Sequence, residues 1–237
     1  MTINVYWTRL ASDLMSPLRI PAPEPLLKHI NYKEFLGPNV SRCPAIVDDL
    51  KNIFVIKSPI TIKLSIVNGT NAKIEHQSPE FGKLFFGEAE GKLGLHQIAS
   101  SYLFFADKSL MMTQLPAYYD VNSFTENTFQ ITGSFDIGRW FRASGKPTFL
   151  LKPGKTVIDI KEGDALMYIK FNTTEKISLV EFDFNEIQEM KSLNPANACV
   201  GLKDNATSLI SLERCYQYFE QFKMRQKVLK LIKRNKI

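Results

Sequence analysis

The sequence has few of the residues on which disulfide and metal sites depend. Its 237 residues include three cysteines and three histidines, and no two cysteines form a CxxC pair. The wide spacing of Cys43, Cys199 and Cys215 argues against a disulfide framework and a zinc site, and it fits a reducing compartment. We therefore expect no metal and no cofactor.

The histidines lack the spacing of an iron site. Intracellular jelly rolls that bind iron use a His-x-Asp or His-x-Glu pair together with a distant histidine. His29, His76 and His96 occur as HIN, HQS and HQI, so none has an acid two residues further on. Each histidine is expected to be a surface or partly buried polar residue.

Catalytic and targeting motifs are also missing. There is no G-x-S-x-G elbow, no phosphate loop and no G-x-G-x-x-G fingerprint, so no catalytic residue is predicted. No run reaches the ~18 apolar residues of a transmembrane helix, and the N-terminus MTINVYWTRLASDLM does not resemble a signal peptide. We expect a soluble, intracellular protein that does not bind a membrane.

Three carboxylate pairs are typical of solvated turns: Asp48/Asp49, Glu88/Glu90 and Glu162/Asp164.

Prolines and alternating apolar residues divide the chain into three parts. Seven of the twelve prolines lie in the first sixty residues, which predicts an extended arm over 1–45. Alternation over 53–77, with an Asn-Gly turn, predicts a hairpin. Short apolar runs over 81–150 predict several strands, and 157–184 predicts three consecutive antiparallel strands. Residues 46–185 should thus form a β-sandwich, and 186–237 a helical segment packed on it.

The chain has a formal net charge of +6, and its last fifteen residues, 223–237, contain no acidic residue. Apolar residues at helical spacing, with Ser208 or Ser211 as N-cap, predict a long amphipathic C-terminal helix. Its cations could contact nucleic acid or a partner, or they could oppose the helix dipole and keep an exposed end soluble. The candidates for contact are Lys223, Arg225, Lys227, Lys230, Lys233 and Arg234.

A second candidate site lies in SFDIGRWFRASGKPTF, which begins at Ser134. In a strand, Trp140 and Arg142 share one face, so a guanidinium could stack with an aromatic ring around a planar or anionic ligand. The same residues could instead be a core strand covered by arginine stems. The candidate ligand-binding residues are Arg139, Trp140, Arg142 and His96.

The strings RCPAIVDDLKNIFVIKSPITIKL, GRWFR and GDALMYIKFNT resemble an uncharacterised family of tailed-phage proteins, notably from phages of marine cyanobacteria. The resemblance spans most of 1–185 and implies no known activity. It implies a location in the host cytoplasm or the virion.

Taken together, the sequence predicts a mainly β protein. It should be a jelly-roll-like β-sandwich with an extended N-terminal arm and C-terminal α-helices. The leading hypothesis is a non-enzymatic phage protein that binds a protein partner, either itself or a virion or host protein. One alternative is an auxiliary enzyme for a small anionic metabolite or sugar in a jelly-roll pocket. The other is nucleic-acid binding through the basic C-terminal helix.

Overall fold

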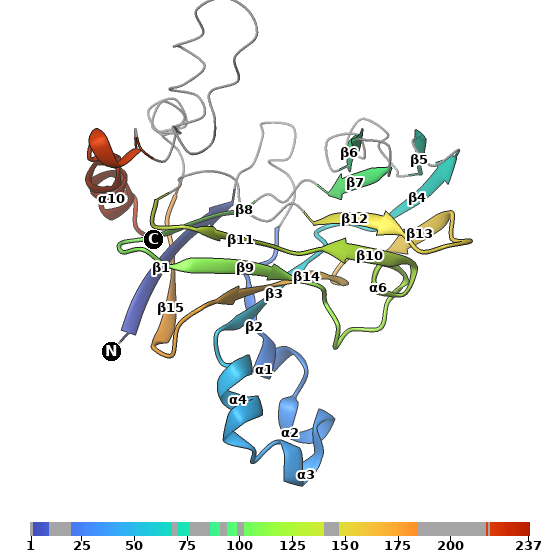
Figure 1. Ribbon diagram of the computed structural model, residues 1–237, viewed down its shortest axis with the longest axis horizontal. Coiled ribbons are helices and arrows are strands. Elements are labelled where there is room, and N and C mark those ends of the chain that lie inside the picture. Colours follow the sequence, from blue (N-terminus) through green and yellow to red (C-terminus); the bar gives the residue numbers. More distant parts are fainter. Residues whose placement is uncertain are drawn as a thin grey trace, which may run out of the picture.

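The computed structural model describes residues 2–9, 20–67, 71–75, 86–90, 94–98, 102–139, 147–183, 217 and 219–237. Its strands form four sheets, and helices lie outside them (Figure 1). The expectation of a mainly β protein with a C-terminal helix is confirmed. Among the described helices, none combines the length and the apolar character that crossing a lipid bilayer requires.

Sheets A and B pack face to face around the larger core. Sheet A has the order β15-β1-β8, and sheet B has the order β11-β9-β14-β3-β2. Both contribute alternate residues to this core, such as Val5, Phe104 and Ile169, because side chains of a strand point to opposite faces in turn. The strands of sheet A are β1 (Thr2–Arg9), β8 (Tyr102–Ala106) and β15 (Lys176–Glu181). Those of sheet B are β2 (Glu24–Pro25), β3 (Ile53–Lys57), β9 (Met111–Leu115), β11 (Gly133–Asp136) and β14 (Ala165–Phe171).

Sheets C and D enclose a second core, which also contains Phe124 of the short helix α6 (Ser123–Asn127). Sheet C has the order β13-β4-β5, and sheet D the order β10-β12-β7-β6. The strands of sheet C are β4 (Ile62–Val67), β5 (Asn71–Glu75) and β13 (Val157–Ile160). Those of sheet D are β6 (Phe86–Glu90), β7 (Leu95–Ile98), β10 (Thr128–Ile131) and β12 (Thr148–Leu151).

The predicted hairpin over 53–77 is confirmed in its second half. Strands β4 and β5 pair antiparallel, with Val67 opposite Asn71. The alternation of the sequence is also the observed burial, because Ile62 and Leu64 are buried in the second core and Lys63 is exposed. The first half, β3, belongs to sheet B instead.

The three strands predicted over 157–184 exist, but they do not pair with one another. Strand β13 pairs with β4, β14 pairs with β3 and β9, and β15 pairs with β1. Segments 53–66 and 157–171 form one antiparallel ribbon that bends at Ser58–Ile60 and 161–164. There Ser58 N–H donates to Asp164 O at 2.8 Å and Gly163 N–H donates to Ser58 O at 2.9 Å. Pro59 at the bend has no N–H to continue the ladder, so the ribbon passes from sheet B to sheet C.

The predicted extended arm over 1–45 is wrong for much of that range. Residues Thr2–Arg9 form β1, the central strand of sheet A, where Ile3, Val5 and Trp7 are buried. Four short helices follow the extended stretch at 20–25: α1 (Leu26–His29), α2 (Tyr32–Phe35), α3 (Gly37–Val40) and α4 (Pro44–Leu50).

Prolines lie at the start of three of these four helices rather than prevent them. Pro25 is the N-cap of α1, and Pro38 and Pro44 lie in the first turns of α3 and α4, where a missing N–H costs no hydrogen bond. Leu26 and Leu50 are buried against Val55 and Tyr168 of sheet B. The helices therefore cover the outer face of sheet B, at the bottom of Figure 1.

The C-terminal helix α10 (Met224–Arg234) covers the outer face of sheet A. Its residues Val228 and Ile232 are buried with Tyr6 and Phe105 of sheet A. The prediction of one uninterrupted helix is wrong, because Lys223 has a left-handed φ of 50° and separates α10 from the helical residues before it. The predicted N-cap residues Ser208 and Ser211 lie outside the described residues.

Candidate functional site

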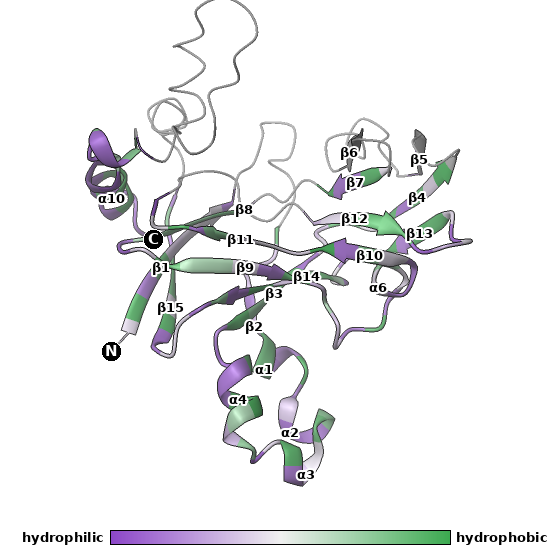
Figure 2. Cartoon of the chain, in the orientation of Figure 1, coloured by the Kyte–Doolittle hydropathy of each residue, from purple (hydrophilic) through white to green (hydrophobic). Residues whose placement is uncertain are grey.

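Helix α10 has two chemically distinct faces. Val228, Leu231 and Ile232 are at most 4% exposed and pack on sheet A. The polar face points away from this contact, so purple and green segments alternate along the helix in Figure 2. The exposed cations of this polar face are Lys223, Lys227, Lys230, Lys233 and Arg234, which we call the basic face.

The basic face is ordered along the helix. Lys227, Lys230 and Arg234 follow one another at intervals of three and four residues, the spacing that places side chains in one row of a helix, and Lys223, the N-cap residue, precedes this row by four residues. Within the described part of the chain, no carboxylate lies within ion-pair distance of any of these cations. Their charge is therefore not neutralised by any carboxylate in the part of the chain that the structure describes.

Arg225 behaves differently from the other predicted contact residues. Its Nε donates to the carbonyl oxygen of Gly138 at 2.6 Å, and it is only partly exposed. This bond joins α10 to the turn after β11. Arg225 therefore holds the helix on the sandwich, and it is not counted as part of the basic face.

The turn at Gly138 explains part of the GRWFR motif. A Cβ at Gly138 would lie 2.0 Å from the carbonyl oxygen of Lys108, so only glycine allows this approach of two backbone segments. The side chain of Asp136 accepts the N–H groups of Gly138 and Leu110, both at 2.9 Å. This part of the motif is structural.

Of the predicted ligand-binding residues, Arg139 and His96 are described, and these two do not lie together. Arg139 is exposed and its Nε donates to Glu220 Oε1 at 2.6 Å, which holds the pKa of Glu220 below its usual value. His96 is 1% exposed in β7, with its ring 5.6 Å from that of Phe149. In Figure 1, β7 lies at the opposite end of the structure from α10, whereas Gly138, the residue before Arg139, is hydrogen-bonded to Arg225 of α10. Trp140 and Arg142 lie outside the described residues.

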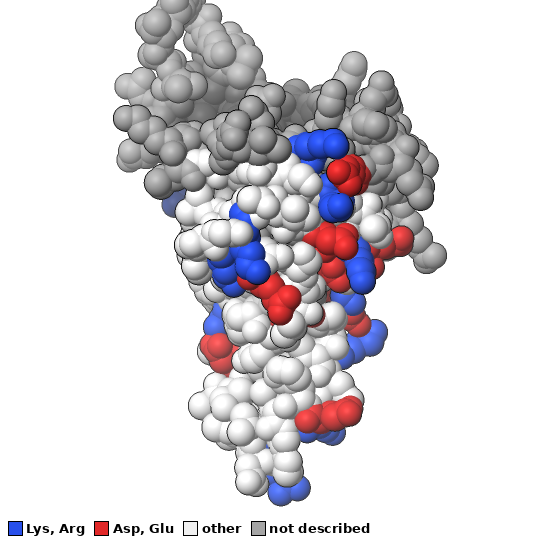
Figure 3. Space-filling model, turned by 90° about the vertical axis from the view of Figure 1, so that its right-hand side faces the viewer, with Lys and Arg blue, Asp and Glu red and all other residues white. Residues whose placement is uncertain are grey.

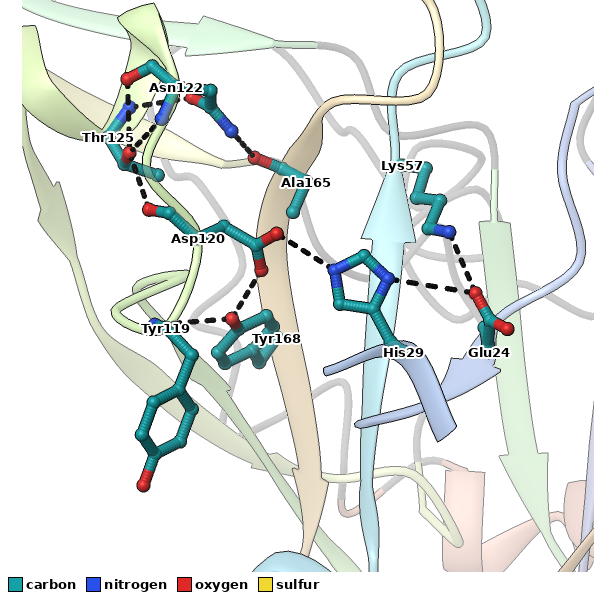
Figure 4. A network of polar contacts seen from close by, with 9 residues as sticks. All are labelled: Glu24, His29, Lys57, Tyr119, Asp120, Asn122, Thr125, Ala165 and Tyr168. Atoms are coloured by element: carbon teal, nitrogen blue, oxygen red, sulfur yellow. Dashed lines mark hydrogen bonds and ion pairs between the residues drawn. The ribbon is translucent and has the colours of Figure 1, made fainter. Parts of the chain in front are cut away.

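A second cluster of ionisable groups was not anticipated from the sequence. We call it the polar clamp, and Figure 4 shows its members pointing toward one another: Glu24, His29, Lys57, Asp120 and Tyr168. His29 Nε2 lies 2.8 Å from Asp120 Oδ1, and His29 Nδ1 lies 3.7 Å from Glu24 Oε2. The hydroxyl of Tyr168 donates to the other oxygen of Asp120.

Local structure places Asp120 accurately. The segment after β9 ends in α6, where Asn122 and Thr125 form a capping box. The Asn122 amide donates to Ala165 O at 3.0 Å, and the Thr125 hydroxyl donates to Asp120 O at 2.8 Å. Asp120 is thereby fixed above β14, and His29 of α1 reaches it from the helical segment.

The surroundings shift the pKa values of two clamp residues, Glu24 and Tyr168. The hydrogen bond from Lys57 Nζ to Glu24 Oε2, at 2.7 Å, holds the pKa of Glu24 below its usual range despite partial burial. Burial raises the pKa of Tyr168 well above its usual value, and the bond to Asp120 adds to the effect. The Tyr168 hydroxyl therefore stays neutral and remains a donor.

The clamp has the composition of an acid–base site but not its geometry. A general base needs a nitrogen or oxygen that faces the substrate. Both ring nitrogens of His29 face carboxylates of the protein, and the Tyr168 hydroxyl is fully buried. Among the described residues, no group of three or more His, Cys, Asp or Glu side chains is arranged so that it could hold a metal ion. The clamp therefore joins the helices to sheet B.

Comparison with known proteins does not assign the chain to a class. No protein-family model, no curated protein and no solved structure matches it.

Proposed function

We propose that this is a non-enzymatic interaction protein whose basic face binds nucleic acid. The observation that supports this proposal most is the row of exposed cations on α10, which has no carboxylate partner in the described structure. Along an α-helix of ~1.5 Å rise per residue, the row from Lys223 to Arg234 extends roughly 16 Å. A duplex presents a phosphate about every 3.4 Å along each strand, so several phosphates lie within that length.

The helix dipole explains only part of this charge. Lys233 and Arg234 lie in the last turn, where cations are favoured by the dipole. Lys223 and Lys227 lie near the opposite end, where the dipole disfavours cations. The solubility interpretation of the sequence therefore leaves the first half of the row unexplained, whereas phosphate binding explains the whole row.

Nucleic acid fits the basic face better than an acidic protein does. Exposed positions between Lys227 and Arg234 are occupied mainly by lysine and by no aromatic residue. Protein interfaces are depleted in lysine and enriched in aromatic residues. On the face shown in Figure 3, by contrast, basic and acidic side chains lie mostly beside one another.

The test compares two triple variants of equal charge. Lys227→Gln/Lys230→Gln/Lys233→Gln removes three cations of the basic face, and the control, Lys33→Gln/Lys155→Gln/Lys161→Gln, removes three exposed lysines elsewhere. Binding to a fluorescent duplex of arbitrary sequence is measured by anisotropy between about 50 and 200 mM salt. We expect the first variant to bind at least about tenfold more weakly, with a salt slope lower by about 2.7, and the control to resemble the wild type.

Two results would contradict the proposal. Equal losses in both triple variants would assign binding to net charge alone. Binding of polyglutamate with the affinity of the duplex would indicate an acidic protein as the partner.

The phage setting and the jelly-roll assignment remain part of the proposal. The phage setting, as a virion component or a protein directed at a host molecule, rests on the sequence resemblance alone. The jelly-roll assignment is supported by the face-to-face packing of sheets A and B, which have antiparallel pairs in both sheets. The enzyme alternative loses support, because Arg139 and His96 do not share a site.

A further inference from the structure

Strand β15 leaves one edge of sheet A open. Among the strands that the structure describes, its only neighbour in the sheet order is β1, with which it pairs in parallel. In a strand, the N–H and C=O of one residue point to the same side, and successive residues alternate. Phe182 N–H donates to Trp7 O of β1 at 3.1 Å, so even-numbered residues face β1. The backbone groups of Ile177, Leu179 and Glu181 therefore face away from β1.

The chain already pairs with part of this open edge. Asp183 N–H donates to Asn235 O at 2.8 Å, and Ile237 N–H donates to Glu181 O at 3.3 Å. Phe182 and Lys236 thereby form an antiparallel bridge. Residues 235–237 thus act as a short added strand at one end of the edge. Within the described structure, the backbone groups of Ile177 and Leu179 have no such partner.

A groove runs beside the unpaired part of the edge. It has a volume of about 1280 Å³ and lies where the layer of β15 and the layer of β2 separate. Pro23, Pro25, Phe54, Ile177 and Leu179 form its apolar lining. An extended chain on this edge could place every second side chain against that lining.

The charges around the groove are nearly balanced. Lys51 pairs with Asp48, Lys170 pairs with Asp49, and Glu175 pairs with Lys108 at 2.9 Å. Lys176 is exposed and has no ion-pair partner among the described residues. The groove thus offers one unpaired positive charge at the start of β15.

We propose that the open edge of β15 binds an extended segment of a partner protein by strand addition. The segment pairs its backbone with Ile177 and Leu179 and places alternate apolar side chains in the groove. A carboxylate of the segment lies near Lys176. This surface is independent of the basic face of α10.

Proline at position 179 tests the inference with a matched control. Leu179→Pro removes an N–H that faces the groove and leaves the bonds to β1, a position where an edge strand accepts proline. Leu179→Ala removes the same side chain but keeps the N–H. A library of random nonapeptides is selected on the wild type, and the enriched peptides are then measured on both variants.

We expect enriched peptides with alternating apolar residues and an acid, which bind Leu179→Pro at least about tenfold more weakly than Leu179→Ala. Enriched peptides that bind both variants equally would overturn the inference, and so would the enrichment of no peptide.

Amide hydrogen exchange of the wild type provides a second readout that does not depend on folding of the variants. In the free protein, the amides of Ile177 and Leu179 should exchange faster than those of Ser178 and Val180, and peptide should slow them. Slow exchange of Ile177 and Leu179 in the free protein would contradict the open edge.

Discussion

The basic face and the polar clamp both consist of ionisable side chains, but they differ in their partners. In the clamp, His29 lies between Asp120 and Glu24, and Lys57 neutralises Glu24. On the basic face, no cation has a carboxylate within reach in the described structure. Charges that neutralise one another inside the protein can stabilise its fold, whereas charges left in water remain free to bind a charged partner.

Loss of the central carboxylate should have the largest effect on stability. Asp120→Ala leaves the partly buried His29 and the buried Tyr168 hydroxyl without their shared acceptor. We expect the free energy of unfolding to fall by about 2–4 kcal/mol, because stranded polar groups keep their desolvation cost. Urea denaturation measures the loss. Asp159→Ala, which removes an exposed acid outside any ion pair, is the control; an equal loss there would show that the clamp adds no stability.

Acid should weaken the clamp through Glu24. Its pKa is lowered in the folded state, so its contribution is present above the unfolded pKa and is lost as the pH falls through the folded value. As the pH falls through the ordinary range for glutamate, from about 5 to 3, the wild type should lose more stability than Glu24→Gln. Thermal unfolding across this pH range checks the difference. Parallel curves for the two proteins would exclude Glu24 as the titrating group.

The smallest effect on stability is expected on the basic face. Lys227→Gln/Lys230→Gln/Lys233→Gln removes exposed charges without internal partners, so the free energy of unfolding should change by no more than about 0.5 kcal/mol. Urea denaturation measures it. A loss as large as that of Asp120→Ala would mean that these lysines stabilise the fold.

Sequence reasoning found the elements whose burial follows a simple period. The alternation from Ile60 to Ile66 and the apolar face of α10 both matched the observed burial, because each element is covered on one side. Strand β1 has the same alternation in Ile3, Val5 and Trp7. It was missed because the prolines that follow it led to the prediction of an extended arm over the whole of 1–45.

The helices over 26–50 were missed for a related reason. Proline is excluded from the interior of a helix but is favoured in its first turn. Pro25, Pro38 and Pro44 lie at helix starts, so they are compatible with the helices that follow them. A local sequence pattern also could not predict which strands pair with one another. The turn at 161–164 has hairpin residues, yet the ribbon bends there because its partner strand is interrupted at Pro59.

The clamp could not be found from the sequence. His29 and Asp120 are 91 residues apart, and Tyr168 is a further 48 residues along the chain. No spacing rule connects such residues, and only the packing of α1 on sheet B brings them together. The basic face, in contrast, lies within one helix, where the spacing of cations can be read directly.

The most direct test measures stability and duplex binding on the same two variants. The account predicts that Lys227→Gln/Lys230→Gln/Lys233→Gln loses binding and keeps stability, and that Asp120→Ala loses stability and, while folded, keeps binding. If each variant lost both properties in proportion, the division between charges that hold the fold and charges that bind a partner would be contradicted.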